Sequence, residues 1–266
     1  MLFTITFVLV MTTLLSSHQH EVTVEKEMAF VAHRGASYLA PENTLASISL
    51  AWELGADAAE CDVMLTADNR VILFHDSNTK KLTGESHVVS ETPWAKLSIL
   101  NVRPRETNLP KYRNEPIPLL KDVLGSVPVH RLLVIEIKTG PEILPYLKEV
   151  VDAHWTFGQI SFIAFDFETI KATKALYPKV PCYYLSTFKA DVKKHFNAVV
   201  EFGLDGLDLR HGIIDRELAD HCRQAGLDLW CWTVNDPETA ASMKSLGVSA
   251  VTTDRPKWLR ENMPIH

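Results

Sequence analysis

Residues 31–76 read VAHRGASYLAPENTLASISLAWELGADAAECDVMLTADNRVILFHD, and this stretch organises the rest of the chain. Two histidines, His33 and His75, lie near its ends, and an acidic pair, Glu60 and Asp62, lies between them. Each of these residues lies at or near the end of a short apolar run typical of a β-strand. Because residues two apart in a strand face the same side, Glu60 and Asp62 are expected to project together.

The second half of this stretch predicts a β-hairpin. Residues 66–70 read TADNR, a turn-forming cluster, and residues 71–74 form another strand-like run, VILF. If the chain folds back about Asp68, His75 returns to the level of Cys61. One imidazole and two carboxylates are then neighbours, whatever the rest of the chain does.

Beyond residue 28 the chain alternates strand-like and helix-like segments. Eight apolar runs predict strands, at residues 29–34, 58–64, 132–137, 160–165, 181–185, 206–209, 229–233 and 249–252. Six amphipathic stretches predict helices, at residues 44–54, 144–153, 167–176, 191–202, 215–224 and 237–246. Either Asn43 or Thr44 fits the N-cap of the first helix, and glycines follow several of the helices.

Eight strands with intervening helices favour an α/β fold, a closed (β/α)8 TIM barrel. The number of barrel strands is eight only if residues 71–74 form the returning strand of a hairpin and not a ninth barrel strand. A doubly wound open sheet is the alternative, but no G-x-G-x-x-G follows the first strand. Residues 77–116 are rich in turn residues and lack periodicity, which indicates a small insertion after the hairpin that follows strand 2.

Composition limits the classes of function. The 266 residues are 46% hydrophobic and 23% charged, with a net charge of −6 and no basic tract, so nucleic acid and anionic membrane surfaces are not expected partners. A barrel domain over residues 28–262 accounts for most of the chain. None of the four cysteines has metal-type C-x-x-C spacing; Cys61, Cys182 and Cys231 lie in apolar runs and are expected to be small buried residues. Disulfides are possible but not implied.

The N-terminus predicts an exported protein. Residues 2–15 are apolar and uncharged, too short for a membrane span of about 20 residues but similar to a secretory signal peptide over residues 1–20. The expected location is therefore periplasmic or secreted, without stable membrane insertion after processing. A short uncleaved anchor, or a cytoplasmic protein whose start lies further along the chain, is the alternative. The oligomeric state is not indicated.

Short motifs along the chain resemble those of one enzyme family. They are HRG (33–35), PENT (41–44), ExD (60–62), FHD (74–76), IPLLKDVL (117–124), EIK (136–138), WTVN (232–235) and TDRP (253–256). In this order and spacing they resemble the glycerophosphodiester phosphodiesterase family, from about residue 28 to near the C-terminus. The resemblance implies a metal-dependent hydrolase that converts glycerophosphodiesters to sn-glycerol 3-phosphate and an alcohol.

Polar residues at the carboxyl ends of barrel strands are expected to form the site. Glu60, Asp62 and Glu136 would supply an all-oxygen ligand set, which favours one divalent cation, Ca²⁺ or Mg²⁺. The alternative is that these acids only form salt bridges with Arg34 and Lys138 at the barrel mouth. Cys61, between two of the acids, is expected to face away.

The resemblance suggests the remaining roles. His33 and His75 form a general acid–base pair, because histidine titrates near neutral pH. Arg34 and Lys138 bind the phosphate. Trp232 packs on the glycerol carbons or, nearly as well, in the barrel core. Asn43 is expected to cap a helix, and Asp254 to fix the last loop.

Two other functions stay open on the same scaffold. One is a secreted phospholipase, of the phospholipase D type or phosphoinositide-cleaving, for which Trp94 and Leu97 of the insertion could provide an apolar rim. The other is a non-catalytic protein that binds phosphodiesters.

Overall fold

The structure, a computed structural model, describes residues 27–155 and 159–264. Eight parallel strands form a closed barrel, because each pairs with the next and the last pairs with the first. In order around the barrel they are β1 (Ala29–Ala32), β2 (Ala58–Leu65), β6 (Leu132–Ile137), β7 (Gln159–Ala164), β8 (Cys182–Ser186), β9 (Gly206–Arg210), β10 (Asp228–Trp232) and β11 (Ala250–Thr253). The predicted TIM barrel is confirmed.

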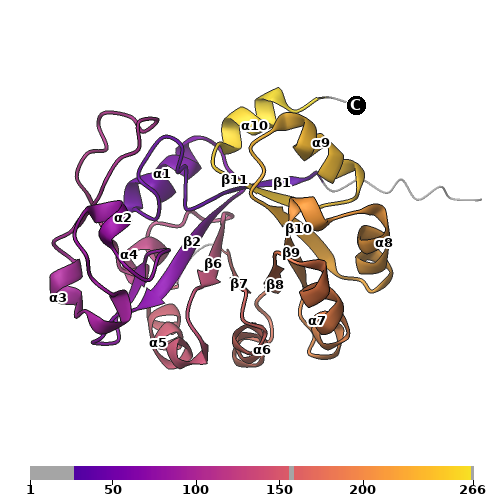
Figure 1. The fold of residues 1–266 in the computed structure, drawn as a ribbon, viewed down its shortest axis with the longest axis horizontal. Helices are drawn as coiled ribbons and strands as arrows, with labels where there is room; N and C mark the ends of the chain where they lie inside the picture. Colours follow the sequence, from indigo (N-terminus) through magenta and orange to yellow (C-terminus); the bar gives the residue numbers. More distant parts are fainter. Residues whose placement is uncertain (1–26, 156–158, 265–266) are drawn as a thin grey trace, which may run out of the picture.

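Helices surround these strands (Figure 1). They are α1 (Leu45–Glu53), α4 (Leu120–Leu124), α5 (Leu144–His154), α6 (Phe167–Leu176), α7 (Lys189–Glu201), α8 (Arg216–Gln224), α9 (Pro237–Ser245) and α10 (Pro256–Asn262), with the 3-10 turns η2 (Pro141–Ile143) and η3 (His211–Ile213). The six predicted helices are present. The two that sequence periodicity missed, α4 and α10, are too short to show a repeating apolar face.

The strand β3 (Val71–Leu73) runs antiparallel to β2 and lies outside the barrel. Its register pairs Val63 with Leu73 and Leu65 with Val71. Continued by two residues, this register sets His75 opposite Cys61. The predicted hairpin is therefore confirmed, together with the level to which His75 returns.

The insertion carries α2 (Lys80–Thr83), η1 (Val89–Glu91), α3 (Trp94–Leu97) and the two-residue strands β4 (Asn101–Val102) and β5 (Glu115–Pro116), which pair with each other. Its apolar residues pack with the hairpin in a small core of their own. Leu97 is fully buried there, and Trp94 packs against the same core. Neither residue forms an exposed apolar rim.

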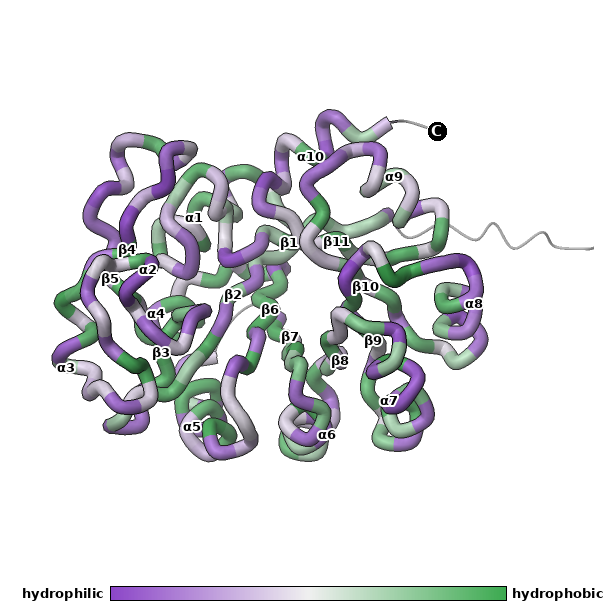
Figure 2. Tube along the Cα trace, in the orientation of Figure 1, coloured by the Kyte–Doolittle hydropathy of each residue, from purple (hydrophilic) through white to green (hydrophobic). Residues whose placement is uncertain are grey.

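Two apolar layers stabilise the barrel. One fills the barrel interior, with Val31, Val134 and Trp230 among its members, and the other lies between the strands and the helices. Figure 2 shows the corresponding concentration of hydrophobic residues along the central strands. All four cysteines are buried and free, and Cys61 packs in the outer layer, away from its acidic neighbours, as predicted.

The predicted signal peptide, residues 1–20, lies outside the described residues. Within the part of the chain that is described, none of the helices has the length and apolar character that crossing a bilayer requires.

Candidate active site

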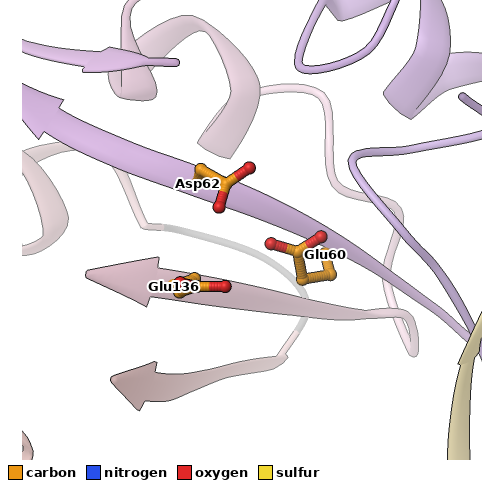
Figure 3. A group of neighbouring side chains, drawn as sticks. All are labelled: Glu60, Asp62 and Glu136. Atoms are coloured by element: carbon orange, nitrogen blue, oxygen red, sulfur yellow. The ribbon is translucent and has the colours of Figure 1, made fainter. Parts of the chain in front are cut away.

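Three carboxylates meet at one side of the barrel mouth. Glu60 and Asp62 project from β2, and Glu136 projects from the adjacent strand β6, where it is the register partner of Asp62. Figure 3 shows the three side chains turned toward one another. One oxygen from each lies within 4.8 Å of the other two, and Glu60 and Asp62 are only 2% and 1% exposed.

Burial and mutual repulsion raise the pKa of two of these acids. The pKa of Glu60 is well above its usual value because the side chain is desolvated and lies near Asp62 and Glu136. The same causes raise the pKa of Glu136 to about 7, although Lys138 opposes the shift. Without a further cation beside them, these two acids therefore resist ionisation.

Arg34 is held against the acids by its backbone and by its side chain. Arg34 and Gly35 both have positive φ angles, 55° and 76°, so the chain turns sharply after β1. The turn aims the Arg34 N–H at Glu60 Oε2, 2.7 Å away, and brings Arg34 Nε to 3.2 Å from Asp62 Oδ2. A side chain on Gly35 would collide with Ser47 of α1, so this turn requires glycine.

Lys138 approaches the cluster from β6. Its Nζ donates to Glu136 Oε1 at 2.6 Å and lies 3.6 Å from Asp62 Oδ1. Burial would lower the pKa of Lys138, but the carboxylates of Glu136 and Asp62 raise it above its usual value. Lys138 is therefore charged at neutral pH.

The acids do form salt bridges with Arg34 and Lys138, as in the interpretation without a metal ion. These salt bridges do not satisfy all of the carboxylate oxygens. Glu60 has no ion pair with any side chain in the described ranges, and Glu60 Oε1 and Asp62 Oδ1 are buried without a hydrogen-bond donor. A buried carboxylate oxygen without a donor is costly. Three oxygen-donating groups with free lone pairs at this spacing fit a hard divalent cation.

His33 is oriented by Asp254, from the opposite end of the chain. Its Nδ1 lies 2.7 Å from Asp254 Oδ1, which also accepts from Ser37 Oγ at 3.1 Å, and Asn235 Nδ2 donates to the other oxygen at 2.7 Å. These hydrogen bonds outweigh burial and keep the pKa of Asp254 well below its usual value. Sequence reasoning assigned Asp254 to the loop and missed its contact with His33.

His75 is oriented in the same way by its neighbour Asp76. Its Nδ1 lies 2.6 Å from Asp76 Oδ1, and Lys81 Nζ lies 3.3 Å from the other oxygen. An ionised carboxylate can only accept, so in both histidines Nδ1 carries the proton and Nε2 is free for proton transfer. Burial lowers the pKa of His75. The positive charges of Arg34 and Lys138 lower it further, and the carboxylate of Asp62 opposes the shift.

Asn43 does not cap the first helix. The N-cap is Thr44, whose hydroxyl accepts from Ser47 N at 3.1 Å in a reciprocal capping box. Asn43, with a φ of 55°, instead donates to Asp62 Oδ2 at 2.7 Å and accepts from Asp62 N at 3.0 Å. Asn43 thereby fixes the rotamer of Asp62, a candidate metal ligand. The sequence did not reveal this role, because Asn43 is also a common N-cap residue and precedes Thr44, the actual N-cap.

Trp232 ends β10 on the far side of the mouth. Its indole Nε1 donates to Asp208 O at 3.2 Å, and its ring meets Phe165 edge-on, with centroids 5.5 Å apart. It is half-buried and packs against the barrel interior, so it can serve both of the roles considered for it.

Comparisons with known proteins identify the family of the chain. The sequence model of the Glycerophosphoryl diester phosphodiesterase family matches residues 33–258. The chain is 30% identical over 240 residues to YhdW of Bacillus subtilis (strain 168), covering 87% of this chain and 96% of that protein. It is 29% identical over 234 residues to a glycerophosphodiester phosphodiesterase of Caldanaerobacter subterraneus subsp. tengcongensis, covering 86% and 95%.

Solved structures show the same fold. A phosphodiesterase of Oleispira antarctica, in complex with the product sn-glycerol-3-phosphate, superimposes with a TM-score of 0.79 at 27% identity, over 88% of this chain and 95% of that chain. A glycerophosphodiester phosphodiesterase of Thermotoga maritima gives 0.73 at 23% identity, over 88% and 98%.

A TIM barrel with clustered acids, two histidines and two cationic side chains at its mouth is the arrangement of a phosphoric diester hydrolase. The chain belongs to the glycerophosphoryl diester phosphodiesterase family. The resemblance found in the sequence motifs is therefore confirmed.

Proposed function

We propose that the protein hydrolyses glycerophosphodiesters to sn-glycerol 3-phosphate and an alcohol, with a divalent cation and the pair His33 and His75. The observation that carries the proposal is the convergence of both imidazoles, each oriented by a carboxylate, on one buried acidic cluster. The product named in the Oleispira antarctica complex belongs to the same reaction.

Glu60, Asp62 and Glu136 would hold the cation, and their all-oxygen donor set favours Ca²⁺ or Mg²⁺ over zinc. When bound, such an ion supplies Lewis-acid polarisation and neutralises negative charge on the reacting phosphate. Asn43 fixes Asp62, and the Arg34 N–H fixes Glu60, so two ligands are oriented in advance.

Formal charge at the mouth suits one phosphodiester anion. Three carboxylates, the two cations Arg34 and Lys138, and a divalent ion leave one positive charge, which matches the single negative charge of the substrate. Arg34 donates through a planar fork that suits phosphate oxygens, and Lys138 contributes a point charge.

The two histidines would divide the proton transfers. A lowered pKa keeps His75 neutral at pH 7, which suits a base that takes the proton from the attacking oxygen. His33, with its Nδ1 proton held by Asp254, would then donate from Nε2 to the leaving alkoxide. Asp254 and Asp76 would keep each ring in the tautomer that this exchange needs.

The test is turnover of glycerophosphocholine by His33→Ala and His75→Ala. Each substitution should lower kcat by about 10²–10⁴ while binding of sn-glycerol 3-phosphate stays measurable. His154→Ala, at the exposed end of α5, is the matched control. Near-normal turnover in either site variant would exclude that histidine from the mechanism. Activity that survives treatment with a chelator would exclude the divalent cation from it.

A lipid-cleaving activity keeps one specific observation in its favour. Phe165 and Phe188, which follow β7 and β8 on the side of the mouth that carries Trp232, are 41% and 64% exposed. Exposed aromatic side chains are suited to contact with a lipid interface. Faster turnover of phospholipid vesicles than of glycerophosphocholine would favour this function, and the reverse is expected.

We also propose that residues 1–20 direct export, because their apolar, uncharged sequence is similar to a signal peptide. N-terminal sequencing of the protein from an exporting host should find a chain that lacks this segment. A full-length chain in the cytoplasm would contradict the proposal.

A further inference from the structure

A fourth buried carboxylate, Glu42 of the PENT motif, lies beside the acidic cluster. It is 2% exposed, and each of its oxygens meets a different guanidinium. Arg34 Nη1 donates to Oε1 at 2.6 Å, and Arg105 Nη2 donates to Oε2. Because a buried carboxylate is costly unless its oxygens are satisfied, both arginines stabilise Glu42.

Arg105 comes from the insertion and is fixed by its own loop. Asn108 Oδ1 accepts from Arg105 N at 2.8 Å, and Asn108, which is 8% exposed, donates to Ser37 O at 3.1 Å. One residue further, Leu109 N donates to Leu39 O at 2.7 Å. The loop is thus attached by hydrogen bonds to the backbone that follows His33 and Arg34, which holds the backbone of Arg105 in place while its side chain, 48% exposed, reaches Glu42.

The two contacts decide which nitrogen of Arg34 is available to a ligand. Nη1 donates to Glu42, and Nε is buried 3.2 Å from Asp62 Oδ2, in an ion pair without hydrogen-bond geometry. Nη2 has no partner within residues 27–155 and 159–264. We propose that Arg105 is a positioning residue, which acts through Glu42 to keep Arg34 Nη2 directed at the substrate phosphate. The proposal rests on the proposed function of the site.

Loss of Arg105 would change the geometry of Arg34. Glu42 Oε2 would remain buried without a donor, and Arg34 is the other guanidinium already in contact with this carboxylate. A guanidinium and a carboxylate form a stable two-bond fork, so Arg34 would turn onto both oxygens of Glu42. Its remaining nitrogens would then be withdrawn from the phosphate.

Charge supports the same conclusion. Glu42 adds a fourth negative charge beside the mouth and would cancel the single positive charge left by Arg34, Lys138, the three carboxylates and a divalent ion. Arg105 restores that charge. Without Arg105 the formal charge beside a phosphodiester anion is zero, so substrate attraction is weakened as well.

The experiment compares Arg105→Ala with Arg103→Ala, using the full chain and glycerophosphocholine. Arg103 lies two residues away in the same loop, is exposed, and forms no ion pair with a carboxylate in the described part of the chain. Arg105→Ala should raise KM about tenfold with kcat nearly unchanged, because the lost contacts hold substrate and transition state alike. Arg105→Lys, which restores the charge on Glu42, should recover most of the effect, and Arg103→Ala should behave as wild type.

A double-mutant cycle separates positioning from general charge. In a Glu42→Gln background, Arg105→Ala should add little, because the residue through which it acts has lost its charge. Equal effects of Arg105→Ala in both backgrounds, or equal effects of Arg103→Ala and Arg105→Ala, would overturn the proposal. If the alanine variant does not fold, Arg105→Gln tests the same loss of charge.

Calorimetric binding of sn-glycerol 3-phosphate tests the proposal without turnover. The Arg105→Ala protein should bind this product about tenfold more weakly than wild type, and unchanged affinity would reject the positioning role. A wild-type protein that binds the product but turns over no phosphodiester would instead reject the proposed function and leave the binding comparison valid.

Discussion

The barrel interior holds buried carboxyl groups in two different settings. On one wall Glu60, Asp62 and Glu136 lie together with Arg34 and Lys138, and on the opposite part of the barrel Asp208 of β9 stands alone. Leu207 and Leu209 pack in the outer core, so by strand alternation Asp208 faces inward. Asp208 is 1% exposed, and its Oδ1 has no hydrogen-bond donor.

Burial alone therefore does not make a site. Desolvation, with a smaller contribution from Glu136, raises the pKa of Asp208 well above its usual value, which favours the neutral acid in the interior. The three clustered acids have Arg34 and Lys138 beside them, which favour ionisation, whereas no cation of the described residues forms an ion pair with Asp208. The difference between a candidate ligand set and a solitary buried acid lies in the neighbouring charges.

The largest expected contrast is in activity. Asp62→Asn should lower kcat/KM at least about a hundredfold, because Asp62 is a proposed ligand and also contacts Arg34, Lys138 and Asn43. Asp208→Asn should leave kcat/KM within about twofold of wild type, since the raised pKa of Asp208 favours its uncharged form, and the amide has the same shape. Steady-state kinetics on both variants measure kcat/KM. A comparable loss of kcat/KM in both would contradict the distinction between the clustered acids and Asp208.

The second contrast is the response of stability to pH and cations. Without a divalent ion, the raised pKa of Glu136, about 7, makes the folded state lose stability as pH rises from about 4.5 through 7, because the unfolded carboxyl ionises more readily. A bound cation reverses this penalty by favouring the ionised form. Thermal unfolding with and without Ca²⁺ or Mg²⁺ should therefore show more stabilisation at pH 8 than at pH 5; equal stabilisation at both would contradict the assignment.

Asp208 gives a smaller effect on stability. Its raised folded-state pKa makes it destabilising at every pH above its unfolded value, and the penalty grows as pH rises toward the folded-state pKa. Asp208→Asn should thus stabilise the protein by about 1 kcal/mol at pH 8 and by less at pH 5. Chemical denaturation at the two pH values tests the trend, and greater stabilisation at the lower pH would show that Asp208 is charged in the fold.

The smallest effect concerns the aromatic side of the mouth. Trp232→Leu should raise KM for glycerophosphocholine about threefold, since it removes the edge-on contact with Phe165 and an aromatic surface for the substrate. Thr187→Ala, in the loop after β8, serves as the control. A Trp232→Leu protein with unchanged KM and lowered stability would assign Trp232 to the barrel core alone.

Local sequence patterns predicted much of this site. The hairpin and the i, i+2 spacing of Glu60 and Asp62 depend on neighbours in the chain, and both are present in the structure. His75 and Asp76 are adjacent, so their contact was also within reach of the sequence.

The contacts that were missed join distant residues. Asp254 lies 221 residues from His33, and Arg105 lies 63 residues from Glu42, in a segment without periodicity. No local pattern encodes such pairs, because they form only when the barrel has closed and the insertion has packed on it. The buried Glu42 was itself a signal, since a carboxylate next to Asn43 in an apolar stretch requires a cation from elsewhere.

The hydrogen bond between His33 and Asp254 has a consequence for biosynthesis. The proposed catalytic imidazole of His33 directly follows β1, the first barrel strand to be synthesised, and its carboxylate partner Asp254 directly follows β11, the last. The nascent polypeptide cannot complete this pair until translation has passed residue 254. The Asp254 contact that orients His33 therefore cannot form before β11 and the loop after it have been made.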